Sequence, residues 1–203
     1  MSTTQSPTPR LPAAERREAI VRAAIPVFSS RSYAGATTAE IAREAGVSEP
    51  ILYRHFPSKR ELYFACLETA WAELRAILEA KLSRLSSPAR DDVLQSTALA
   101  VRRSKVLVPN LWLQAINEAA NDPEMQRRMR EHMREVHDVI AGLLGQAQKA
   151  GAIPADRDVG AEAWIFISGG LLLTVADRLG GVLRAGDFDR ITTQRQRWLL
   201  GRD

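Results

Sequence analysis

The sequence predicts an all-α protein, in which an N-terminal three-helix helix-turn-helix domain is joined to a larger C-terminal helical domain, with about nine helices. Apolar residues recur at helical spacing, Gly and Pro fall where these segments end, and no alternating strand pattern occurs. We expect a flexible tail at residues 1–12, the first domain at 13–63 and the second at 86–203. A connecting fourth helix should reach about residue 85.

The first two helices are expected within residues 13–45. Apolar residues have helical period over 13–30, and Pro26 predicts a kink or a 3₁₀ ending there because proline has no amide hydrogen. Thr37 and Glu40 have the spacing of a capping box, which predicts the start of the second helix. Gly46 is placed to end that helix in the left-handed conformation.

The next two helices follow the same logic. Ser48 as a cap and Pro50 in the first turn predict a third helix of about two turns, ending near His55. Ser58 and Glu61 form a second capping box, which opens the long fourth helix. Two short helices joined by a tight glycine-containing turn and supported by a third are a helix-turn-helix motif.

The C-terminal domain is expected to contain only helices. Asp122 and Gly151 are placed to start and to stop the longest of them. The expected ranges are about 89–105, 109–120, 123–150, 159–179 and 188–200.

Composition favours a soluble, cytoplasmic protein. The longest nearly unbroken apolar run, residues 164–176, is shorter than the ~20 residues that cross a bilayer, so we expect no membrane partner. The N-terminus lacks the features of a signal peptide. Cys66 is the single cysteine; a packed thiol and a reducing compartment are expected.

The positive charge is concentrated near the N-terminus. Residues 1–60 hold nine Lys and Arg against five Asp and Glu, whereas residues 61–203 hold 19 of each. A solvated charged face would also give this excess, but a polyanionic partner for the first domain is the more specific interpretation.

The helix-turn-helix motif predicts which side chains would meet DNA. In this motif the second helix enters the major groove, and surrounding polar groups hold phosphates. Tyr53, His55 and Lys59 can donate to phosphate oxygens. The side chains left to face bases are Ser48, Glu49, Pro50, Ile51 and Arg54.

The segment TTAEIAREAGVSEPILYRHFPSKRELY closely resembles the DNA-binding signature of the TetR/AcrR family of transcription regulators. The resemblance covers about residues 13–63. It implies that the helix starting at Ser48 reads bases, that Gly46 makes the turn, and that a dimeric, ligand-released repressor binds double-stranded operator DNA. It further implies phosphate contacts from Thr37, Thr38, Tyr53, His55 and Lys59.

A pocket for a small, mostly apolar effector is one interpretation of the Met and aromatic residues in the C-terminal domain. Met side chains recur every four residues near His132, which is also typical of core filler. The resemblance to TetR-like regulators favours the pocket. Its candidate residues are Trp112, Gln114, Asn117, Met129, His132, Met133, Trp164, Phe166 and Ser168.

The last two helices are the candidate homodimer interface. The helix at 159–179 is apolar nearly all round, so it must be covered on both sides, either by a second copy or as an ordinary core helix. The resemblance favours the interface. Its candidate residues are Ile167, Leu171, Phe188, Ile191, Trp198 and Leu199.

Catalysis is not expected, and neither is a cofactor or a metal. His132 and His137 are five residues apart and so do not share a helix face as a metal-binding pair would. Two alternatives remain open at this point: a dimeric DNA-binding protein that responds to no effector, and an all-helical enzyme or small-molecule carrier that uses the Met and aromatic region.

Overall fold

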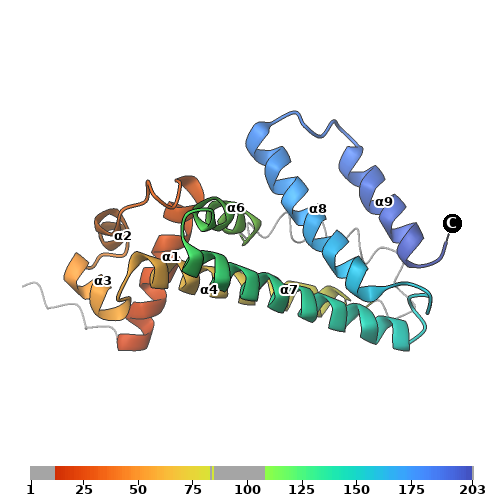
Figure 1. Cartoon of the computed structure of the whole chain (residues 1–203), viewed down its shortest axis with the longest axis horizontal. Helices are drawn as coiled ribbons and strands as arrows, with labels where there is room; N and C mark the ends of the chain where they lie inside the picture. Colours follow the sequence, from red (N-terminus) through yellow and green to blue (C-terminus); the bar gives the residue numbers. More distant parts are fainter. Residues whose placement is uncertain (1–11, 83, 85–107, 203) are drawn as a thin grey trace, which may run out of the picture. The chain divides into compact units, whose positions relative to one another are not determined.

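The computed structural model describes residues 12–82, 84 and 108–202. Within these residues every regular element is a helix, as the sequence predicts (Figure 1). The expected helix at 89–105, the linker before it and residues 1–11 of the tail lie outside the described residues. The helices are α1 (Ala13–Ser30), α2 (Thr38–Glu44), α3 (Glu49–His55), α4 (Lys59–Leu82), α6 (Val108–Ala119), α7 (Pro123–Lys149), α8 (Val159–Leu179) and α9 (Asp187–Leu199).

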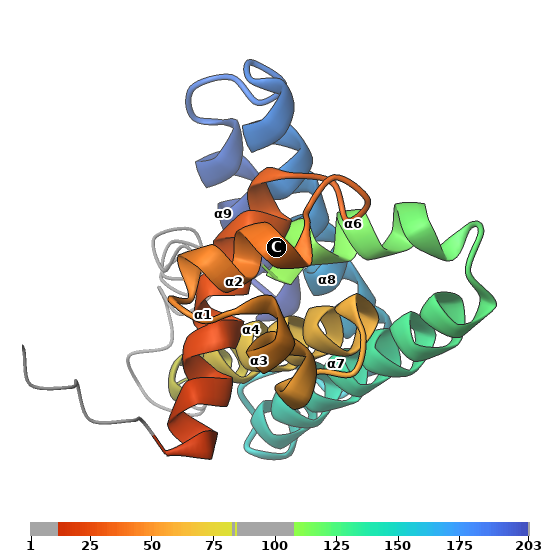
Figure 2. The same ribbon diagram turned by 90° about the vertical axis from the view of Figure 1, so that its left-hand side faces the viewer.

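The chain divides into two compact units, residues 1–66 and 67–203. The first unit holds α1, α2, α3 and the beginning of α4 (Figure 2). α1 remains α-helical through Pro26 as far as Ser30, so the 3₁₀ ending expected there is wrong. The amide that Pro26 lacks costs one hydrogen bond, and the buried apolar face of α1 offsets that loss.

Two side-chain caps and one glycine set the helix boundaries of the first unit. The Thr37 hydroxyl accepts from the Glu40 amide at 3.2 Å, and Ser58 accepts from the Glu61 amide at 3.1 Å, as the capping boxes predict. Gly46 has φ 65°, and its amide bonds to Arg43 O while the next amide bonds to an earlier carbonyl. This Schellman ending turns the chain tightly from α2 into α3.

The core of the first unit is aromatic and dry. Tyr63 of α4 is fully buried and meets the Phe28 ring edge-on, with 4.9 Å between centroids, and the Tyr33 ring at 5.1 Å. Cys66 is buried beside them, and its thiol donates to Val21 O at 3.8 Å. Burial raises the pKa of this thiol well above its usual range, so Cys66 is an inert packed thiol, as expected.

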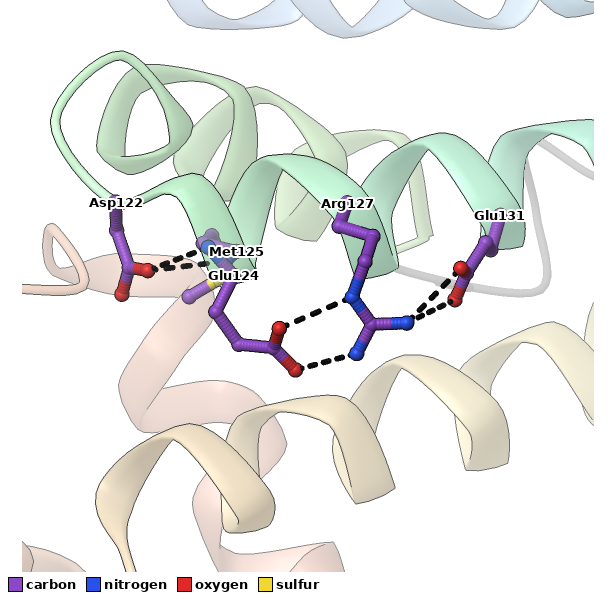
Figure 3. Close-up of polar contacts among 5 residues, drawn as sticks. All are labelled: Asp122, Glu124, Met125, Arg127 and Glu131. Carbon is purple, nitrogen blue, oxygen red and sulfur yellow. Dashed lines mark hydrogen bonds and ion pairs between the residues drawn. The ribbon is translucent and has the colours of Figure 1, made fainter.

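The second unit is organised around α7. One face of α7 is buried along its whole length, from Met125 to Ala147, and this helix contacts both α6 and α8. Asp122 caps it by accepting from two backbone amides at 3.0 and 3.1 Å (Figure 3). The expected Met stripe is therefore split, because Met125 and Met129 are buried in the core whereas Met133 is half-buried.

α8 is less covered than its sequence suggests. It is long and apolar enough by composition to cross a membrane, although little of it is buried within the described residues. Against a membrane role, it carries the buried Glu162, which pairs with Arg195 of α9 and accepts from the Trp198 indole at 3.1 Å. These polar contacts join α8 to α9 at one end of the helix pair.

Candidate functional sites

α3 presents a short row of exposed side chains. Ser48 caps the helix through its backbone, and its hydroxyl makes no capping bond, so this polar group faces outward. Pro50 and Arg54 are also exposed, and Ile51 is half-buried. All five residues expected to face bases, Glu49 included, thus lie at least partly open to solvent, and Arg54 has no ion pair within residues 12–82.

The fifth, Glu49, has a structural contact that sequence reasoning missed. The Thr38 hydroxyl donates to the Glu49 carboxylate at 2.5 Å, which leaves its oxygen to accept from the Tyr53 hydroxyl at 3.1 Å. Thr38 is only 9% exposed. One buried hydroxyl on α2 therefore fixes two side chains of α3, and sets how that helix presents its outer face.

The other residues expected to hold phosphates lie around α3. Tyr53 is 44% exposed even though its hydroxyl touches Thr38, and Thr37 is exposed at the start of α2. The Lys59 ammonium lies 3.3 Å from Ala34 O and 4.6 Å from the centre of the Tyr33 ring. His55 is half-buried at the end of α3. These groups come from three helices of one compact unit.

The nine residues expected to form one effector pocket fall into separate places. Trp112, Gln114, Met129 and His132 are buried in the interior of the second unit. Met133 and Trp164 line a groove between α6, α7 and α8, which Met129 also touches. Phe166 and Ser168 line a different groove, between α8 and α9, and Asn117 is exposed on α6. The single pocket expected from the sequence is therefore divided by helix packing.

The interior group belongs to a cluster of aromatic rings whose polar nitrogens are buried. The His132 ring meets Trp112 at 6.0 Å and Trp71 of α4 at 6.5 Å, each edge-on. All three rings are buried, and among residues 12–82, 84 and 108–202 no hydrogen-bond partner meets either indole N–H or His132 Nε2. Burial lowers the pKa of His132, and the nearby Glu135 opposes that shift in part. Unpaired buried nitrogens bind water or polar ligand groups.

The candidate dimer residues also divide by burial. Ile167 and Leu199 are 4% and 3% exposed, so both pack inside their own chain and offer almost no surface to a second copy. Ile191 and Trp198 are exposed, whereas Leu171 and Phe188 are half-buried. Ile165 and Leu172 are exposed on α8 as well, and the sequence analysis did not single them out. Their spacing of seven residues on one helix face could have identified them.

Two family models match the chain. The model described as bacterial regulatory proteins, tetR family, matches residues 20–66, which include α2, α3 and the turn between them. The model described as BetI-type transcriptional repressor, C-terminal, matches residues 108–168, which cover α6, α7 and the first half of α8.

Individual relatives align over parts of their length. The chain is 54% identical over 59 residues to the HTH-type transcriptional activator FasR of Mycolicibacterium smegmatis, which is 29% of this chain and 27% of FasR. It is 28% identical over 131 residues to the HTH-type transcriptional regulator BetI of Rhizobium meliloti, covering 63% of this chain and 64% of BetI. The chain thus spans about a quarter of FasR and less than two thirds of BetI.

Solved structures match over nearly the whole chain. A transcriptional regulator of the TetR family from Cytophaga hutchinsonii has a TM-score of 0.72 at 16% identity, covering 96% of this chain and 98% of that one. GusR of Salmonella enterica has a TM-score of 0.66 at 20% identity, covering 92% and 96%. At these identities the similarity establishes the fold.

Proposed function

We propose that this chain, which belongs to the TetR family of bacterial regulatory proteins, is a sequence-specific DNA-binding transcription regulator that a small ligand releases from its operator. The observation that carries this proposal is the outer face of α3. Ser48, Pro50 and Arg54 are exposed together on a short helix that a Schellman turn and the Thr38 hydroxyl hold in place. Exposed polar side chains on such a helix suit the edges of bases in the major groove.

Base reading and phosphate binding would be divided between α3 and its surroundings. Arg54 would read guanine, and Ile51 would contact a thymine methyl group. Tyr53, Thr37, His55 and Lys59 would hold phosphates and set the register of the protein on the duplex. Glu49 would act mainly through its bond to Thr38, because that bond occupies one of its carboxylate oxygens.

Two copies would bind one operator. The exposed apolar side chains Ile165, Leu172, Ile191 and Trp198 belong to α8 and α9 and leave apolar surface for a second chain to cover. A two-fold axis through this face would present two reading helices to one side of the duplex. Half-sites about one helical turn apart, or a multiple of that, would follow from the symmetry.

Ligand release would couple the second unit to the first. A ligand shifts this equilibrium only if it binds the DNA-incompetent state better, and a typical coupling is about 1–3 kcal/mol. The match of residues 108–168 to a repressor C-terminal model supports repression as the sign of regulation. A protein whose second unit only dimerises is the alternative, and it differs by keeping its DNA whatever small molecule is added.

The test is fluorescence anisotropy on duplex DNA taken from immediately upstream of the protein's own gene, in a salt series, with random duplex as competitor. We expect tight binding that resists the competitor, and log K that falls linearly with log salt. If the protein binds this duplex no more tightly than random DNA, the operator lies outside the tested upstream region. If selection from a random DNA library also found no preferred sequence, the proposed reading role of α3 would be wrong.

A further inference from the structure

An open groove of about 440 Å³ lies between α6, α7 and α8. Its described lining residues all belong to the second unit. Its apolar lining includes Ile116 of α6, Met129 and Met133 of α7, and Trp164 of α8. Ile116 and Trp164 are 48% and 45% exposed, so two large apolar side chains face solvent in a concave place. Concave apolar surface with a few polar groups is the usual form of a small-molecule site.

The polar side chains that line this groove all come from α7: the amide of Gln126 and two arginines. Arg130 and Arg134 line it, both are exposed, and they are four residues apart, where like charges on a helix repel. Neither has a carboxylate partner within residues 108–202. The groove therefore combines an apolar floor with two uncompensated positive charges.

Three of the four carboxylates on α7 are already engaged, and the fourth, Glu135, acts electrostatically on Arg75 and His132. Arg127 binds Glu124 at 2.7 Å and Glu131 at 3.0 Å, which engages both acids of that helix face (Figure 3). Asp138, four residues beyond Arg134, contacts His137 Nδ1 at 2.9 Å. The same helix thus pairs one arginine twice, whereas Arg130 and Arg134 have no carboxylate partner within residues 108–202, and an anionic ligand would supply that counter-charge.

We propose that the groove between α6, α7 and α8 binds an amphipathic anion, a carboxylate with an apolar body. The carboxylate would accept hydrogen bonds from Arg130 and Arg134, whose planar guanidinium groups suit its two oxygens. The apolar body would cover Trp164 and Ile116 and remove their apolar surface from water. Cationic ligands would be rejected, because both charged groups among the described lining residues are positive.

The binding step does not depend on the proposed function, whereas its effect on DNA does. Binding is therefore measured first without DNA, by isothermal titration calorimetry with decanoate kept below its micelle concentration. Decanol and decyltrimethylammonium carry the same tail with a neutral and a cationic head, and acetate carries the head alone. We expect saturable binding of decanoate, weaker binding of decanol, and none of the cation or of acetate.

Variants assign the site. The double substitution Arg130→Gln with Arg134→Gln should weaken decanoate binding roughly tenfold, and added salt should weaken binding to the unsubstituted protein more than to the variant. Trp164→Ala should also bind decanoate more weakly, because the apolar body of the ligand loses the surface that Trp164 offers. Lys149→Gln is the matched control, because it removes a positive charge from the same helix outside the groove lining and frees no carboxylate near the groove, and it should bind decanoate like the unsubstituted protein. Circular dichroism checks that each variant is folded.

Two binding results and one sedimentation result would overturn the proposal. One is equal affinity for decanoate and for the cationic analogue; the other is an unchanged affinity in the Arg130 and Arg134 double variant. If sedimentation instead shows that Trp164→Ala changes the oligomeric state, a second copy covers the groove and the ligand assignment fails. Decanoate that binds at this groove without releasing DNA would leave the site established and would count against ligand-released repression alone.

Discussion

At the scale of single residues, one lysine substitution and one arginine substitution test the division between base reading and phosphate binding. Lys59 lies against Ala34 O and the Tyr33 ring, at the start of α4, whereas Arg54 is exposed on α3. A phosphate contact contributes to all sequences alike, and a base contact contributes at one position of the site.

We therefore expect Lys59→Ala to weaken binding about equally on all duplexes and to lower the salt slope by about one. Arg54→Ala should relax the preference at one base step and cost about 1–3 kcal/mol on the preferred sequence. Anisotropy on a panel of single-base operator variants measures both. A loss confined to one sequence for Lys59→Ala would make that lysine a base-reading residue.

His132 provides a pH test of the interior aromatic cluster. Burial holds the pKa of His132 below its ordinary value of 6.5 in the folded protein. Between the lowered pKa of the folded state and the ordinary pKa of the unfolded state, the unfolded chain binds more protons than the folded one. The free energy of unfolding should therefore fall as the pH drops below about 6.5, by at most about 1.4 kcal/mol per pH unit. Urea unfolding at several pH values measures it.

His132→Gln is the informative variant for this dependence. It should flatten the fall in stability over that pH window, because the titrating group is gone. His55→Gln is the control, because His55 is half-buried on α3 in the other unit. This variant should keep the pH dependence of stability that His132 causes. An equally steep pH profile in His132→Gln would show that other groups control acid stability in the second unit.

At the scale of elements, a turn and a helix-to-helix ion pair carry much of the geometry. Gly46 turns α2 into α3 with φ 65°, and the space around it is open to a methyl group. A side chain at position 46 would therefore destabilise the protein through backbone strain and not through a clash. Glu162 is 7% exposed between α8 and α9, and its partner Arg195 is 28% exposed.

Gly46→Ala should destabilise the first unit by about 1–2 kcal/mol, because a residue with a Cβ rarely adopts the left-handed conformation. Gly142→Ala is the matched control. Gly142 lies inside α7 with the same open space but helical backbone, so alanine should stabilise it by about 0.5–1 kcal/mol. Thermal unfolding that ranks the two variants in the opposite order would refute the assigned role of Gly46.

Glu162→Gln should keep an acceptor for the Trp198 indole while removing the charge that faces Arg195. We expect a loss of about 1–3 kcal/mol, less than for a fully buried pair because solvent reaches Arg195. Glu79→Gln, which breaks the exposed pair with Arg75, should lower stability far less, because solvent screens that pair. Unfolding in urea is compared at one protein concentration, and equal losses for the two variants would contradict this difference.

At the scale of the whole molecule, the exposed apolar face of α8 and α9 decides whether two chains act together. Leu172→Glu places a charge at a side chain that is 40% exposed on α8. We expect sedimentation velocity to show monomers, and operator affinity to fall at least tenfold as the second reading helix is lost. Ile116→Glu is the control, since Ile116 has similar exposure but lies on α6. A Leu172→Glu protein that remains dimeric would exclude this face.

The sequence by itself determined the helical class, the helix boundaries and the helix-turn-helix segment, because these depend on interactions local in the chain. Caps at Thr37 and Ser58 and the turn at Gly46 act on their own neighbours, so short-range spacing identifies them. The boundaries expected for α1 and α8 are confirmed for the same reason.

Only the tertiary structure decided which side chains meet. Periodicity could not show that Thr38 bonds to Glu49 and Tyr53, that Trp71 joins His132, or that Ile167 and Leu199 are turned inward. It also could not separate one expected pocket into an interior cluster and two grooves. These outcomes depend on how helices far apart in sequence pack and rotate against each other, and a hydrophobic pattern records that a face is apolar without recording what covers it.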